Sequence, residues 1–135
     1  MKKTISKLKK ELDNWFSKYI RLREATTEGM TQCFTCGKID HYKNLQNGHF
    51  QSRRHHATRW DETNCQVQCI KCNMFGQGEQ YKFSLYLDAK YGVGTSEELE
   101  YQSKQTIKMT RIDYVENISY YKELVNKIKD EKKIE

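Results

Sequence analysis

The sequence predicts a mostly helical α+β protein, in which helices near both ends flank a small central unit containing cysteines. Apolar residues recur at spacings of three and four over residues 4–23, and again over residues 112–128, which indicates two amphipathic helices. From Thr31 to about Arg59 the apolar pattern is broken and short, which is typical of turns and a short β-hairpin with a polar loop. The 135 residues suit one domain, 1–135.

Within this domain we expect a basic N-terminal helix in residues 1–30, a core in residues 31–92 and C-terminal helices in residues 93–135. The apolar positions of the first and last helices are Ile5, Leu8, Leu12, Trp15, Tyr19 and Leu22, and then Ile112, Val115, Ile118, Tyr121, Leu124 and Ile128. These side chains are expected to pack in the core and to carry no chemistry.

Two more helices are predicted between the core and the last helix. One runs from about Glu79 to Lys90, with Gly92 as its stop and Tyr81, Leu85 and Tyr86 as its apolar positions. Thr95-x-x-Glu98 predicts a capping box for a short helix near residues 96–103, and Thr110-x-x-Asp113 is a weaker form of the same signal for the last helix.

Composition limits the class of protein. At 36% hydrophobic residues the chain can bury only a thin core, so a metal or disulfide would help to stabilise it. No apolar run approaches the roughly 20 residues of a membrane span, and the basic start MKKTISKLKK lacks the apolar segment of a signal peptide. We therefore expect a cytoplasmic protein without membrane contact, whose thiols stay reduced.

The formal net charge of +6 is unevenly distributed. Residues 1–75 hold 14 Lys and Arg against 7 Asp and Glu, whereas residues 76–135 hold 10 against 11. The positive charge therefore belongs to the part that holds the cysteines, as a surface for a polyanion requires. A merely solvated basic surface explains the charge equally well.

Four of the five cysteines form two C-x2-C pairs, Cys33 with Cys36 and Cys69 with Cys72. Four thiolates arranged in this way complete the closed tetrahedral shell of a structural Zn²⁺, whose binding would add folding free energy. Cys65 is the spare cysteine, and a small buried side chain is the expected role for it. A thiol–disulfide protein is the alternative, but no βαβ pattern surrounds the pairs.

The stretch NGHFQSRRHHATRWDETN between the pairs contains the candidate catalytic residues. Phosphodiester hydrolysis needs a base to activate water and a divalent metal to stabilise charge on the phosphate. Histidine suits the first role and an oxygen donor such as asparagine suits the second. Arg53, Arg54 and Arg59 suit contacts with DNA phosphates. A single histidine here is more simply a phosphate contact or a turn cap, but the whole arrangement favours a nuclease.

The order of these motifs resembles the HNH/endonuclease VII group, built on a zinc-stapled ββα-metal (treble-clef) core. Many HNH nucleases have an Asp-His pair, an Asn-Leu-Gln run, and a His or Asn after the last cysteine. The equivalents here are Gly48-His49, Asn64-Cys65-Gln66 and Cys72-Asn73. The stretches GHFQSRRHHATRWDETNCQVQCIKCN, GEQYKFSLYLDAKYG and EELE further resemble the phage NinG/Rap family of recombination endonucleases.

That resemblance implies a structure-specific DNA endonuclease, phage- or prophage-encoded and working in a bacterial host cell. Its substrates would be branched recombination intermediates such as D-loops and Holliday junctions. His49 would be the general base, Asn73 would bind the catalytic Mg²⁺ or Mn²⁺, and Asn64 would tie the hairpin loop and orient the histidine, or simply form a turn.

Gly48 departs from the pattern, because many HNH enzymes have an aspartate there. The second ligand of the catalytic metal is therefore open among His56, Asp61 and Glu79. Alternatively His49 itself binds the metal and another histidine is the base. His56 is the second choice after His49. A zinc-stapled DNA-binding or recombination-mediator protein without catalysis remains the rival interpretation.

Symmetric cutting of a branched junction takes two active sites, which favours a homodimer. The N- and C-terminal helices either form its interface or cover the zinc unit within one chain.

Overall fold

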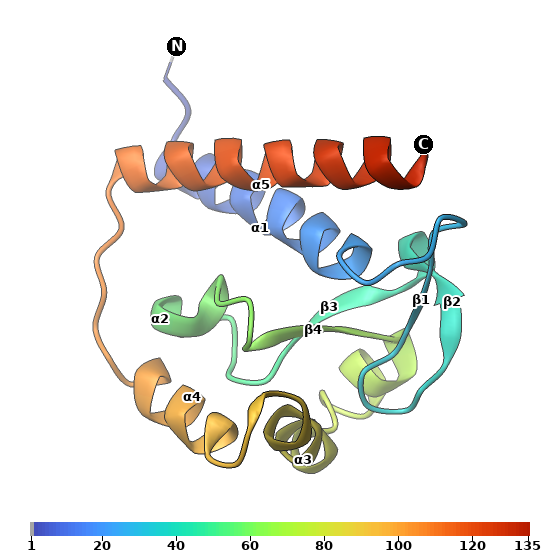
Figure 1. The fold of residues 1–135 in the computed structure, drawn as a ribbon. Helices are drawn as coiled ribbons and strands as arrows, with labels where there is room; N and C mark the ends of the chain where they lie inside the picture. The colour runs from blue at the N-terminus through green and yellow to red at the C-terminus, as the bar shows by residue number, and fades with distance from the viewer. Residues whose placement is uncertain (1) are drawn as a thin grey trace.

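The computed structural model describes residues 2–135. The elements are α1 (Ile5–Leu22), β1 (Met30–Gln32), β2 (Ile39–His41), η1 (Tyr42–Asn44), β3 (Gln46–His49), α2 (His56–Arg59), β4 (Cys65–Gln68), η2 (Lys71–Phe75), α3 (Gln80–Tyr91), α4 (Thr95–Ser103) and α5 (Arg111–Lys132). Helices dominate, and the four strands form two separate two-stranded sheets, so the mostly helical α+β class is confirmed (Figure 1).

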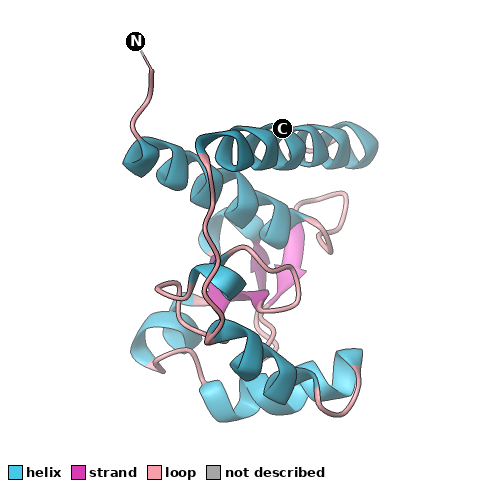
Figure 2. Ribbon diagram, turned by 90° about the vertical axis from the view of Figure 1, so that its left-hand side faces the viewer, coloured by secondary structure: helices cyan, strands magenta, loops and turns pink. Residues whose placement is uncertain are grey.

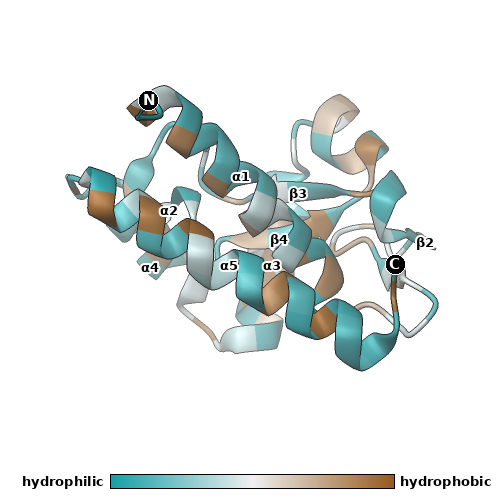
Figure 3. Ribbon diagram, turned by 90° about the horizontal axis from the view of Figure 1, so that it is seen from above, coloured by the Kyte–Doolittle hydropathy of each residue, from teal (hydrophilic) through white to brown (hydrophobic). Residues whose placement is uncertain are grey.

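The two long helices form one layer of the molecule, above β3 and β4 (Figure 1). The first begins where the Thr4 hydroxyl accepts a hydrogen bond from the Lys7 backbone, as a capping residue should. Its buried stripe is Leu8, Leu12, Phe16 and Ile20, against which α5 packs Tyr114 and Tyr121. Figure 3 shows both ribbons changing repeatedly between hydrophilic and hydrophobic colours, as expected of amphipathic helices.

These helices cover one another within a single chain. Within the one chain they also cover the core, since the Tyr114 ring of α5 packs against Trp60 and the Tyr121 hydroxyl donates to Glu62 at 3.0 Å. Among residues 2–135, no helix combines the length and the apolar character that crossing a membrane would require.

The predicted helices are present, but some of the apolar positions expected to be buried are not. In α5, Ile112 and Val115 are exposed, and the buried side chains include Tyr114 and Val125. In α3 the three expected positions Tyr81, Leu85 and Tyr86 are exposed, while Phe83 and Leu87 pack against Leu99 of α4. Each helix has apolar residues on more than one face, and the partner it packs on decides which face is buried.

The two C-x2-C pairs lie at the ends of short antiparallel strands. The first pair lies in the turn between β1 and β2, where Met30 pairs with His41 and Gln32 with Ile39. The second pair follows β4, which pairs with β3 from Gln46–Gln68 to His49–Cys65.

The β3–β4 hairpin, whose first strand ends at His49, extends beyond the segment in which it was expected. Its second strand lies at residues 65–68 and not before Arg59, and the connection between its strands contains α2. The sequence did not indicate this pairing, because a long polar loop separates the two strands and β4 directly precedes the second cysteine pair.

The lower layer of Figure 1 holds α3 and α4, and Figure 2 shows the extended connection that rises from α4 to α5. The capping box expected at Thr95 is absent, because its hydroxyl donates instead to the Gly92 carbonyl and Gly94 precedes the helix. The weaker signal at Thr110 is the real box: Thr110 accepts from the Asp113 backbone, and the Asp113 carboxylate accepts from the Thr110 backbone.

Candidate active site and metal centre

The four cysteines of the C-x2-C pairs gather at one point. Their Sγ atoms all lie within 4.8 Å of one another, and those of Cys36 and Cys69 are 3.6 Å apart. A tetrahedral Zn²⁺ with bonds of about 2.3 Å to sulfur separates its sulfur ligands by about 3.8 Å. The cluster therefore fits a structural metal such as zinc, which would join the β1–β2 turn to the end of β4.

The surroundings of Cys33 favour the thiolate that a metal requires. Burial raises the pKa of the Cys33 thiol, but hydrogen bonds from the backbone of Cys69 and Cys36 outweigh it and lower the pKa to about 6, whereas burial raises the pKa of the Cys72 thiol to about 12. Cys65 lies elsewhere, fully buried in the core between α1 and α5. Burial raises the pKa of the Cys65 thiol far above its ordinary range, so it stays neutral and inert.

An open cleft of about 1090 Å³ lies between α1, β3 and the segment that leads into α3. His49 reaches it from the end of β3, and Asn73 from η2, directly after the last cysteine. Lys10, Arg21 and Arg53 supply positive charge to its walls. The structure thus brings together two of the four residues expected to be catalytic, at a surface suited to an anion.

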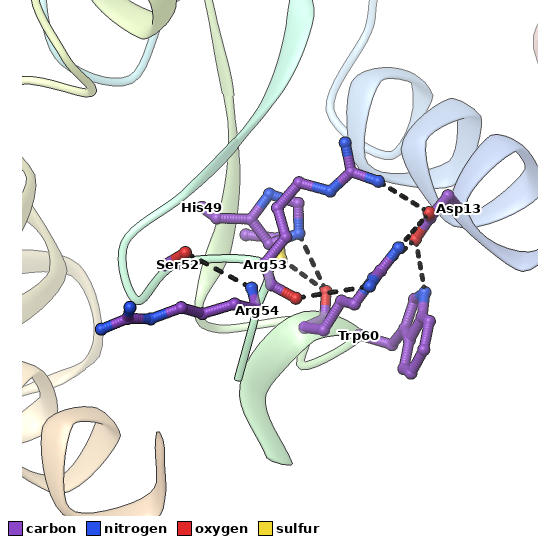
Figure 4. A network of polar contacts seen from close by, with 8 residues as sticks. Asp13, His49, Ser52, Arg53, Arg54 and Trp60 are labelled. Atoms are coloured by element: carbon purple, nitrogen blue, oxygen red, sulfur yellow. Dashed lines mark hydrogen bonds and ion pairs between the residues drawn. The ribbon is translucent and has the colours of Figure 1, made fainter. Parts of the chain in front are cut away.

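The hydrogen bond of His49 fixes which of its nitrogens is free. Its Nε2 lies 2.9 Å from the carbonyl oxygen of Arg59 (Figure 4). Since a carbonyl only accepts, Nε2 must carry the hydrogen, and the lone pair of a neutral ring is then on Nδ1. Burial lowers the pKa of His49, and the nearby charge of Arg53 lowers it further. The ring is therefore uncharged at neutral pH and able to take up a proton.

Asn73 is held by its amide nitrogen. Nδ2 donates to Gln46 Oε1 at 2.8 Å, which leaves the side-chain oxygen free for another partner. The backbone here is π-helical over residues 71–75, a local widening that often occurs at functional sites.

Asn64 is fully buried and does not line the cleft. Its Oδ1 accepts from the Gln51 backbone at 2.7 Å, and its Nδ2 donates to the carbonyls of Gln51 and Thr58 at 3.1 and 3.0 Å. These bonds close the connection between β3 and β4 just beyond His49. Its contacts are those of a residue that positions the loop.

Asp13 of α1 anchors the segment after His49 (Figure 4). Its carboxylate accepts from Arg59 at 2.6 and 3.1 Å, from Arg53 at 2.9 Å and from the Trp60 indole at 2.9 Å. The Arg59 side chain is only 14% exposed and its guanidinium is engaged in this bridge, so it is less accessible to DNA than the sequence suggests. Arg53 is 61% exposed and lines the cleft, while Figure 4 shows Arg54 pointing away from Asp13.

The chain matches the family described as Bacteriophage Lambda NinG protein over residues 1–133. The chain belongs to that family. No curated protein and no solved structure was found to match it.

In this NinG-family chain the second histidine of the cleft is His55, not His56. The His56 ring packs 5.6 Å from that of Trp60 and does not line the cleft, whereas His55 does. The adjacent pair in RRHH gave no means of telling which ring faces the site, because that depends on where α2 begins.

Neither carboxylate considered for the catalytic metal lines the cleft of this NinG-family chain. Asp61 accepts from the backbones of Thr63 and Asn64 at 2.8 and 2.9 Å and so forms a turn. Glu79 precedes α3 in a left-handed backbone conformation, with its carboxylate beside Gly76.

Gly48 has no room for a side chain. A Cβ built on it would lie 1.9 Å from Oε1 of Gln68, a fully buried residue of β4. An aspartate before His49 is therefore sterically excluded as long as Gln68 keeps its place, and the NinG-family chain must obtain any second metal ligand elsewhere.

Proposed function

We propose that this protein is a metal-dependent, structure-specific endonuclease that hydrolyses phosphodiester bonds in branched DNA, such as D-loops and Holliday junctions. One observation carries the proposal: His49 with its free Nδ1 and Asn73 with its free oxygen line the same basic cleft. The preference for branched DNA, the recombination role and the cytoplasm of a phage-infected bacterium come from the resemblance to the NinG/Rap endonucleases.

The reaction follows from the state of His49. Nδ1 accepts a proton from a water molecule, whose oxygen then bonds to the scissile phosphorus. The bond from phosphorus to the leaving oxygen breaks, and that oxygen takes up a proton from solvent. Asn73 would hold part of the shell of a Mg²⁺ or Mn²⁺, which would supply positive charge to the phosphate and the leaving oxygen when bound.

Binding of the DNA backbone falls to the basic residues around the cleft. Arg53 projects from the loop after β3, while Lys10 and Arg21 lie along α1. Contacts of this kind hold phosphates without reading base sequence. A homodimer with two such clefts suits the symmetric cutting of a junction, but its interface would have to leave the α1–α5 contact intact, since that contact is internal.

The rival function is a zinc-stapled DNA-binding or recombination-mediator protein without catalysis. Gly48 favours it, because the aspartate that many HNH enzymes use is missing. The neutral, oriented His49 favours the nuclease, since a binding module needs no base in its cleft.

The test uses zinc-loaded protein with labelled Holliday junction, D-loop, flap and plain duplex, each with EDTA, Mg²⁺ or Mn²⁺. Wild type is compared with His49→Ala and with His56→Ala, which alters a histidine outside the cleft. We expect metal-dependent cutting of branched DNA that His49→Ala abolishes and His56→Ala retains. Binding without cutting in every metal would establish the rival function.

A further inference from the structure

The side chain of Gln68 has an oxygen with no hydrogen-bond donor. Gln68 is fully buried in β4, and its Nε2 donates to the Gly78 carbonyl at 2.9 Å and to Thr35 Oγ1 at 3.0 Å. Because the Gly78 carbonyl can only accept, the amide cannot be turned round, and Oε1 must point the other way. That oxygen has no hydrogen-bond partner, which is costly for a buried polar atom.

Oε1 of Gln68 points at Gly48. The 1.9 Å between it and a Cβ built on Gly48 places the oxygen in the space that a side chain at position 48 would fill. The oxygens of an aspartate lie only two bonds from its Cβ. Gln68 therefore brings an oxygen from β4 to the place where an aspartate before His49 would bring one from β3.

Asn73 lies over the same face of the hairpin. Gln46 and Gly48 are alternate residues of β3, so their side-chain directions share one face of the strand. Asn73 donates to the Gln46 side chain, and Gln46 is the cross-strand partner of Gln68. Gly78, whose carbonyl holds the Gln68 amide, lines the cleft together with Asn73, which puts Gln68 directly behind the cleft wall.

We propose that Gln68 Oε1 is a second protein ligand of the catalytic divalent cation, beside Asn73 Oδ1 and in place of the aspartate that Gly48 lacks. The inference rests on the proposed nuclease function. In both side chains the amide nitrogen is anchored to the protein. The oxygen of Gln68 is buried without a donor, and that of Asn73 is on the cleft side of its anchored amide. Neutral amide oxygens are ligands that Mg²⁺ and Mn²⁺ accept.

This ligand pair predicts how the site behaves. Two neutral oxygens attract a divalent cation less strongly than a carboxylate does, so the free protein binds it weakly and keeps waters on it. Phosphate oxygens of bound DNA then complete the shell, as is usual for Mg²⁺. Cation and DNA therefore strengthen each other's binding.

The test is a titration of zinc-loaded protein with Mn²⁺ alone, followed by electron paramagnetic resonance. Gln68→Ala should raise the Mn²⁺ dissociation constant at least about tenfold, since even changes behind a metal ligand cost that much. Thr35→Val is the control: it removes one hydrogen bond of the same amide but leaves the oxygen, and its Mn²⁺ affinity should stay near that of wild type. Because Thr35 also contacts Cys33 Sγ, the zinc content of this variant is measured first.

The double variant Gly48→Asp/Gln68→Ala gives the inference a second readout. Removing the Gln68 side chain opens the space beside position 48, and the new carboxylate should restore Mn²⁺ binding to wild-type strength or better. Gly48→Asp alone should destabilise the fold because of the clash with Gln68. Zinc content and circular dichroism establish that each variant is folded. If Gln68→Ala does not fold, Gln68→Met replaces it, because methionine fills the space without an oxygen.

Each outcome bears on one idea. Wild-type Mn²⁺ affinity in a folded Gln68→Ala or Gln68→Met protein would overturn the role of Gln68 and leave the nuclease proposal intact. A double variant that folds but binds Mn²⁺ no better than Gln68→Ala would also overturn that role. No Mn²⁺ binding by wild type, with or without a junction DNA, would instead remove the catalytic cation from the proposed function.

Discussion

The imidazole Nε2 of His49 donates to the carbonyl oxygen of Arg59, ten residues along the chain, at 2.9 Å. Arg59 is in turn fixed to α1 by its two bonds to Asp13. The orientation of the proposed base therefore depends on a carboxylate near the N-terminus of the chain. This connection ties the hairpin, α2 and the first helix into one supporting frame for the cleft.

The first prediction concerns pH. The pKa of His49 lies below its ordinary value of 6.5, chiefly because burial disfavours the charged ring. A base works only when unprotonated, so the cleavage rate should be constant above neutral pH and fall in acid, with a midpoint below 6.5. Steady-state rates on a junction between pH 5 and 8 measure this. His56→Ala should keep the profile, and a midpoint above 7 would contradict the assignment.

The same shift affects stability. Between the lowered folded pKa and the unfolded value near 6.5, the unfolded chain binds more protons, so the free energy of unfolding should rise with pH through that window. Denaturant titrations at pH 5 and 7 measure the rise, and His49→Ala should make it smaller.

The second prediction concerns the contact of Arg53 with DNA phosphates. Arg53→Gln should weaken binding to every DNA tested and reduce the salt dependence by about one unit of slope, because one phosphate contact is lost. Lys104→Gln is the control, since Lys104 is a similarly exposed cation at the C-terminal cap of α4, outside the cleft. Fluorescence anisotropy at several salt concentrations gives both slopes. Equal slopes for the two variants would remove Arg53 from the DNA-binding surface.

The sequence predicted part of the candidate site that the structure displays, but not the division of labour among its neighbouring residues. Spacing identified the metal cluster, because a C-x2-C pair forms its own turn and needs no tertiary information. The placing of His49 and Asn73 in one cleft also agrees with motif order. Arg59 and His56 look equivalent to Arg53 and His55 in sequence. The tertiary contacts separate them, because Arg59 is bound to Asp13 and His56 packs beside Trp60, while the other two line the cleft.

The fold shows the same limit of prediction from local sequence. The helices were found because periodicity is a local property, whereas the buried faces of α3 and α5 were misjudged because they depend on neighbours far away in sequence. Thr95 and Thr110 begin similar four-residue patterns, yet only Thr110 has its hydroxyl free to accept from the helix backbone. The role of Gln68 gave no signal, since a buried glutamine in a strand resembles any polar strand residue.

The third prediction tests the frame around His49. Asp13→Asn should lower the free energy of unfolding by about 2 kcal/mol, since a partly buried arginine and an indole lose a charged acceptor. Cleavage should fall as well, because Arg59 no longer holds the carbonyl that orients His49. Glu24→Gln is the control: its ion pair with Lys90 is more exposed and should change stability by less than about 0.5 kcal/mol. Urea denaturation compares them, and equal effects would contradict the anchoring role.

The last prediction concerns the metal cluster. Cys36 is the exposed member of the four, so Cys36→Ser removes a sulfur ligand with almost no change in packing. We expect it to lose zinc and to unfold at a much lower temperature. The metal would join the β1–β2 turn to the end of β4 more firmly than the hydrogen bonds of Phe34 with Val67 and of Thr35 with Gln68 do.

Cys65→Ala is the matched cysteine variant. It empties a buried position in the α1–α5 core, so it should cost about 1 kcal/mol while keeping one zinc per chain. Native mass spectrometry counts the metal and thermal unfolding reports stability. Full zinc occupancy in Cys36→Ser, or its loss in Cys65→Ala, would show that the ligand set differs from Cys33, Cys36, Cys69 and Cys72.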